Sequence, residues 1–103
     1  MRVDILATID KTLGEAQMVS QRTGYSLATI RILISLYREA PLRVTELSTR
    51  VDVTQQAVGK ILRALEYEGL LKQTVDASDR RAILIDLTYK GTNTLTKIAK
   101  VWK

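Results

Sequence analysis

The pattern of hydrophobic and polar positions predicts five helices and one β-hairpin. Apolar residues recur every three or four positions in five segments, a spacing that gathers side chains on one helix face. The five segments are residues 3–22, 26–39, 45–51, 54–68 and 88–102. Residues 71–87 instead alternate with a period of two on either side of a polar turn, which predicts a hairpin.

Turn and capping residues agree with these boundaries. Gly24 and Gly69 follow the first and fourth helices, and Ala40-Pro41 ends the second. Hydroxyls able to accept from the first free amides of the next helices are carried by Ser26, Thr45, Thr54 and Thr88. A short turn between the third and fourth helices indicates a helix-turn-helix. The predicted fold is mainly α with a hairpin wing, a single winged helix-turn-helix domain over residues 1–103.

The fourth helix has two chemically different faces. Its apolar face carries Ala57, Val58, Ile61, Leu62 and Leu65. Thr54 stands at its start, and the opposite face, an arc of about 140°, carries Gln55, Gln56, Gly59, Lys60 and Arg63. A recognition helix needs this division, because the apolar side is held on the protein while polar side chains reach bases and phosphates in the major groove. The alternative is an ordinary solvated helix face, which has the same composition.

The predicted hairpin presents two arginines at its tip. Arg80 and Arg81 are placed to enter the minor groove beside the recognition helix, where narrow A·T-rich DNA has an enhanced negative potential. Asp79 is placed to orient one of them. The alternative is a solubilising turn in which Asp76 and Asp79 only pair with the arginines. The preceding helix-turn-helix favours the DNA interpretation.

Composition removes several classes of function. The chain has 103 residues, a formal charge of +5 and neither cysteine nor histidine. Thiolate zinc sites, thiol redox sensing and most pairings of a nucleophile with a base are therefore excluded, and we expect no catalytic residue, metal, cofactor or enzymatic activity. The first residues do not form a signal peptide, and no segment approaches a membrane span. We expect a cytoplasmic protein without a membrane partner.

The net charge itself gives weak support for a nucleic-acid partner. Residues 42–81 carry seven basic and six acidic side chains, whereas residues 82–103 carry four basic and one acidic. Most of the excess therefore lies near the C-terminus, outside the predicted reading elements. If the middle of the chain binds DNA, the placement of individual arginines and lysines must be responsible.

Residues 44–91 resemble the DNA-binding core of the MarR family of transcriptional regulators. The resemblance is carried by TQQAVGKILRALEYEGLL, by DASDRRAILIDLT and by the Thr-Tyr-Lys-Gly that follows, in this order and spacing. It implies that the polar face of the fourth helix reads the major groove, that Arg80 and Arg81 serve the wing, and that the partner is double-stranded DNA. Arg81 matches the most characteristic wing arginine of the family.

Apolar stripes on both terminal helices predict a homodimer that binds a two-fold DNA site. The stripe residues expected at the interface are Ile5, Ile9, Leu13, Leu95, Ile98 and Trp102. The alternative is that both stripes pack on the chain's own core. Family members usually have a longer final helical region, so the resemblance implies a smaller dimer interface here. A small-molecule effector is compatible with the family but has no support in these residues.

The sequence therefore predicts a sequence-specific double-stranded DNA-binding transcriptional regulator. Two alternatives remain at this point. A winged helix can serve as a protein-protein interaction module, because the fold alone does not determine function. A nonspecific architectural DNA binder would have the same elements without discriminating among sequences.

Overall fold

The computed structural model has the five predicted helices and the hairpin, with one additional short strand. It describes the backbone of residues 2–102, but not the side chains of residues 2–6, 8–10 and 102. In chain order the elements are α1 Arg2–Thr23, α2 Leu27–Glu39, β1 Leu42–Arg43, α3 Val44–Val51, α4 Gln55–Tyr67, β2 Leu71–Val75, β3 Ile83–Leu87 and α5 Tyr89–Trp102. The mainly α fold with a β-hairpin wing is confirmed.

Most of the predicted capping residues act as expected. The hydroxyls of Ser26, Thr54 and Thr88 accept from the backbone N–H groups of Thr29, Ala57 and Gly91 at 3.2, 3.1 and 3.0 Å. Gly24 and Gly69 end their helices with φ of 78° and 80°, a left-handed conformation that costs glycine little.

The predicted cap of α3 is wrong. The helix begins at Val44, before Thr45, and its N-cap residue is Arg43. The Glu46 carboxylate, and no threonine hydroxyl, accepts from the backbone N–H of Arg43 at 2.9 Å. An acidic residue in the first turn is also favoured by the helix dipole.

A short strand that the pattern did not predict extends the hairpin into a three-stranded sheet. The strand order is β1-β3-β2, and both pairings are antiparallel. In the hairpin Leu71 lies opposite Leu87 and Val75 opposite Ile83, while in β1 Arg43 lies opposite Leu84. The wing is therefore joined through β3 to the residue that begins α3.

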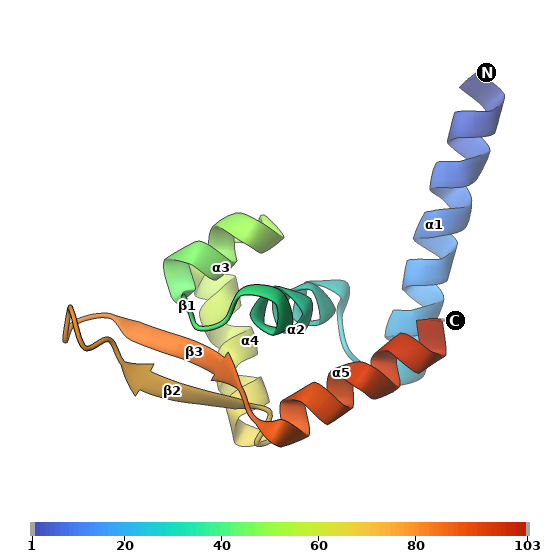
Figure 1. Cartoon of the computed structure of the whole chain (residues 1–103). Helices are drawn as coiled ribbons and strands as arrows, with labels where there is room; N and C mark the ends of the chain where they lie inside the picture. The colour runs from blue at the N-terminus through green and yellow to red at the C-terminus, as the bar shows by residue number, and fades with distance from the viewer. Residues whose placement is uncertain (1, 103) are drawn as a thin grey trace.

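The core lies between α2, the helix-turn-helix and the inner face of the sheet. Its central members on α2 are Ile32, Leu33 and Leu36, all fully buried. Further core side chains come from every other helix and from the sheet: Val19, Leu47, Val51, Val58, Leu62, Leu65, Leu71, Ile85 and Ile98. Figure 1 shows α2 between α3 and α5, with the hairpin extending to one side and the N-terminal part of α1 projecting away from the other elements.

The start of α5 is fixed closely against the base of the hairpin. Thr88 donates its backbone N–H to the carbonyl of Leu70 at 3.0 Å and its hydroxyl to the carbonyl of Gly69 at 2.7 Å. A Cβ on Gly91 would overlap the Leu70 carbonyl oxygen and would lie 3.2 Å from Cδ2 of Leu87. Glycine at position 91 is therefore required by the close approach of two backbones.

We expect Gly91→Ala to lower the free energy of unfolding by about 1–3 kcal/mol, because neither a backbone carbonyl nor a helix can move aside cheaply. Urea unfolding followed by circular dichroism measures this change. Gly14→Ala is the matched control, since a Cβ there meets nothing within 4 Å. It should stabilise α1 by about 0.5–1 kcal/mol. Equal stability of the two variants would contradict the close approach at Gly91.

Candidate nucleic-acid interface

The structure separates the two faces of α4 as the sequence predicts. Val58, Leu62 and Leu65 are buried in the core. The four long polar side chains are exposed, and they have no hydrogen bond or ion pair with any residue whose side chain the structure describes: Gln55, Gln56, Lys60 and Arg63. Arg63 and Glu66, which are three positions apart on α4, do not form an ion pair in the described part of the chain. The polar face is thus available to an external partner.

Two smaller residues complete this face. Thr54 lies at the exposed start of α4, where its hydroxyl is used as the N-cap. A Cβ on Gly59 would meet only Nη1 of Arg63, at an ordinary 3.6 Å. The chain's own packing therefore does not require glycine at position 59. Because glycine has no side chain, the backbone is uncovered in the middle of the exposed face.

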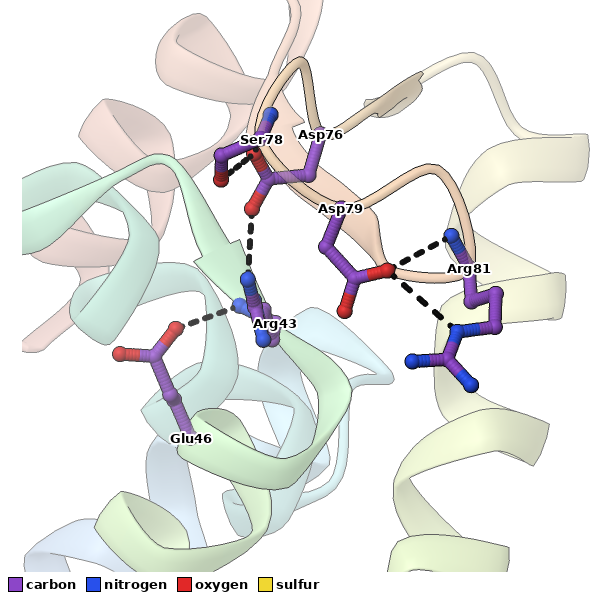
Figure 2. Close-up of polar contacts among 6 residues, drawn as sticks. All are labelled: Arg43, Glu46, Asp76, Ser78, Asp79 and Arg81. Atoms are coloured by element: carbon purple, nitrogen blue, oxygen red, sulfur yellow. Dashed lines mark hydrogen bonds and ion pairs between the residues drawn. The ribbon is translucent and has the colours of Figure 1, made fainter.

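The wing loop, residues 76–82, is closed by its own hydrogen bonds. The backbone N–H of Asp76 donates to the carbonyl of Ala82 at 3.0 Å, and that of Ala82 donates to the carbonyl of Asp79 at 2.9 Å. The Asp76 Oδ1 accepts from both the backbone N–H and the hydroxyl of Ser78, at 2.9 and 2.7 Å. Figure 2 shows the contacts of the Asp76 carboxylate with Ser78 and with Arg43. The loop therefore has a defined shape without a partner.

The wing arginines are presented to solvent. The side chain of Arg81 is 94% exposed, and its Nε lies 3.6 Å from Oδ1 of Asp79. The same oxygen accepts from the backbone N–H of Arg81 at 3.1 Å. Arg80 is also exposed and has no ion pair within the described part of the chain. Asp79 therefore contacts Arg81, as both the orienting role and the solubilising turn predict, while the guanidinium stays accessible.

Asp76 pairs with a residue that the sequence analysis did not single out. Its Oδ2 lies 2.7 Å from Nη2 of Arg43, on β1, and not beside Arg80 or Arg81. The interpretation in which Asp76 neutralises the tip arginines is therefore wrong. The two partners are 33 positions apart in sequence, so only the sheet pairing brings them together.

These contacts stabilise the ionised form of Asp76. Hydrogen bonds from Ser78 and then from Arg43 lower the pKa of Asp76 from 3.8 to about 2. The same pairing with Asp76 raises the pKa of Arg43. Hydrogen bonds to the charged form of a carboxyl outweigh its partial desolvation here.

The residues expected at a dimer interface divide into three groups. Leu13 is 61% exposed on α1, so its side chain is free of the chain's own core. Leu95 is half-buried, and Ile98 is 4% exposed within the core, which leaves little of its surface for a partner. Ile5, Ile9 and Trp102 lie outside the described side chains.

An apolar cleft lies between α2 and α5. It has a volume of about 540 Å³ and is lined by Ile34, Tyr37 and Leu95, among others. Among the residues whose side chains the structure describes, no group of three or more acidic or metal-ligating side chains is arranged to hold a metal ion. No helix in the same part of the chain is long and apolar enough to cross a membrane.

We expect a carboxyl-directed ¹³C NMR titration to place the pKa of Asp76 near 2 in the folded protein. Because folding lowers this pKa, the associated stability is complete above pH 3.8 and is lost as the pH falls toward 2. Ser78→Ala should raise the pKa, whereas Ser20→Ala on α1 should leave it unchanged. A titration near 3.8 in the unsubstituted protein would contradict the hydrogen-bonded wing loop.

Known proteins share both this sequence pattern and this fold. The HTH-type transcriptional repressor MdtR of Bacillus subtilis (strain 168) is 29% identical over 91 residues, which are 88% of this chain and 59% of that protein. The HTH-type transcriptional regulator PetP of Rhodobacter capsulatus is 36% identical over 78 residues, which are 76% of this chain and 47% of that protein. The chain thus spans about half the length of the curated relatives it matches.

Solved structures give the same result for the fold. A transcriptional repressor, CouR, bound to a 23-mer DNA duplex, superposes with a TM-score of 0.80 and 26% identity, covering 92% of this chain and 69% of that one. The sequence model of the MarR family matches residues 26–83, which include the helix-turn-helix and most of the wing. More than half of the sequence is therefore accounted for by this match, and the chain belongs to the MarR family.

Proposed function

We propose that the chain binds double-stranded DNA sequence-specifically and regulates transcription, with α4 in the major groove and the wing in a minor groove. The observation that carries the proposal is the exposed polar face of α4, whose long side chains have no partner within the described chain. The 23-mer DNA duplex bound by the structural neighbour CouR supports it, as do the regulator names of MdtR and PetP.

The proposed roles follow from the chemistry of each side chain. Gln55 and Gln56 have amides that can make paired hydrogen bonds to adenine, so we assign them to base reading. Lys60 and Arg63 contact guanine or phosphates, and Thr54 and Gly59 allow the start and middle of α4 to approach the groove. On the wing, Arg80 and Arg81 enter the minor groove, with Asp79 orienting Arg81.

We further propose that the protein acts as a homodimer on a two-fold site. The support is an exposed leucine on the projecting helix α1, Leu13, which the chain's own core does not cover. The terminal helices, residues 3–22 and 88–102, remain the proposed dimerisation elements of a single domain. Two recognition helices related by a two-fold axis would meet half-sites about one DNA turn apart.

The alternatives are weaker but testable. A protein-protein interaction module would not need amides and guanidinium groups on the open face of α4. A nonspecific architectural binder would use the same surface without preferring a sequence. The family and its relatives are transcriptional regulators and not enzymes, which supports a regulatory role in the cytoplasm, where bacterial DNA is read.

We expect Arg81→Ala to weaken DNA binding by about tenfold on many sequences and to reduce the slope of log affinity against log salt by about 1. Gln56→Ala should instead change the preference among sequences, because an amide reads bases. Fluorescence anisotropy with genomic fragments and mutated sites, at several salt concentrations, measures both effects.

The control for the charge change is Lys97→Ala on α5. It also removes one exposed positive charge, but away from α4 and the wing. It should retain nearly the full affinity. Absence of binding to any duplex at low salt would refute the proposed function in favour of a protein-binding module. Equal affinity for every duplex would favour the architectural alternative.

We expect Leu13→Glu to weaken self-association by about ten- to a hundredfold, because it places a charge where the proposed dimer would bury a leucine side chain. Sedimentation equilibrium at micromolar concentrations measures the change. Lys11→Glu, an exposed position on α1 outside the apolar stripe, is the matched control. A purely monomeric unsubstituted protein, with and without DNA, would exclude the dimer.

A further inference from the structure

One arginine outside the proposed DNA-contacting set, on β1, contacts the wing loop. We propose that Arg43 is a positioning residue, which holds the wing loop through its ion pair with Asp76 in the orientation that presents Arg81 to DNA. This inference rests on the proposed function and assigns a role to a residue on β1, outside the recognition helix and the wing tip. Figure 2 shows the guanidinium of Arg43 directed toward Asp76.

The backbone of Arg43 is held on both sides. Its position on β1 pairs with Leu84 on β3, and its N–H donates to the Glu46 carboxylate at 2.9 Å. Arg43 is also the N-cap residue of α3, directly before its first residue. The backbone of Arg43 is therefore fixed relative to the helix-turn-helix. A group that binds its guanidinium is held in a defined position relative to α3.

The carboxylate of Asp76 joins this fixed point to the wing loop. Oδ2 accepts from Nη2 of Arg43 at 2.7 Å, while Oδ1 accepts from the backbone N–H and hydroxyl of Ser78. The side chain of Asp76 is 15% exposed and that of Arg43 is 40% exposed. Partial shielding from water makes this charge-assisted contact stronger than a fully exposed surface pair.

A continuous series of contacts leads from Asp76 to Arg81. The backbone N–H of Asp79 donates to the carbonyl of Asp76 at 3.3 Å. The carboxylate of Asp79 then accepts from the backbone N–H of Arg81 at 3.1 Å and lies beside its Nε. A shift of Asp76 relative to α3 would therefore be passed to Arg81.

A direct DNA contact is a different role for Arg43. Its Nη2 already donates to Asp76, and a phosphate that accepted the same N–H would require the ion pair to open. In the positioning role the pair stays closed and acts before DNA arrives. A wing without it would have to be ordered on binding, which costs affinity without removing any DNA contact.

The test measures DNA binding by Arg43→Gln, Asp76→Asn, Arg81→Ala and the double variant Arg43→Gln/Arg81→Ala. We expect Arg43→Gln and Asp76→Asn each to weaken binding by about three- to tenfold. In the Arg81→Ala background, Arg43→Gln should weaken binding by clearly less than it does alone, because part of what the ion pair positions, the Arg81 contact, is already absent. Tighter binding by Asp76→Asn, or additive losses in the double variant, would overturn the proposal in favour of a direct phosphate contact.

A second measurement needs no DNA. Backbone ¹⁵N relaxation should show increased motion at residues 77–81 in Arg43→Gln, with α4 unchanged. Arg50→Gln is the matched control, since it breaks another ion pair, with Glu39 at 2.7 Å, away from the wing. A wing loop equally ordered in Arg43→Gln would overturn the inference. If the unsubstituted protein binds no DNA, the proposed function fails separately, while this measurement still decides whether Arg43 holds the wing.

Discussion

The burial of one face of α4 is the constraint on which the candidate interface depends. Val58, Leu62 and Leu65 occupy the core, and removing such side chains from water contributes roughly 1.5–3 kcal/mol each. Since a helix turns by about 100° per residue, fixing these three positions also fixes the direction of Gln55, Lys60 and Arg63. The exposure of the polar face thus follows from the packing of the opposite face.

The sheet is the second constraint, because it fixes the position of the wing relative to the helix-turn-helix. β3 pairs with β2 in the hairpin and with β1 at the start of α3. Leu71 and Ile85 anchor the inner face of the hairpin in the same core that holds α4. α4 and the wing are therefore not independent of each other, and the candidate interface is a single surface built from segments that are distant in sequence.

Periodicity and local capping predicted most of this fold because both depend on residues close in sequence. Ser26, Thr54 and Gly69 act within one helical turn of their own positions, so the sequence alone identifies them. β1 was missed because two residues are too few to show a period. The pairing of Asp76 with Arg43 was missed because many positions separate them, and a hairpin prediction does not tell which strand lies beside it.

The apolar stripe on α5 illustrates a further limit of pattern. Ile98 has the spacing of an interface residue, but it is buried in the chain's own core. Hydrophobic periodicity identifies a face that avoids water and does not identify what covers it. On α1 the same kind of stripe leaves Leu13 exposed, and only the three-dimensional arrangement distinguishes the two cases.

Gly59 is a position where selection for stability and selection for DNA binding would favour different residues. A glycine in the interior of a helix lowers the stability of the helix by about 0.8–1.0 kcal/mol relative to alanine. The surrounding packing does not require a glycine at this position. Selection for thermal stability alone would therefore favour alanine at this position. Under the proposed function, selection for DNA binding would act in the opposite direction wherever the backbone of α4 must come close to DNA. A library screened under the two regimes would diverge at position 59, and the divergence would report how closely helix and groove approach.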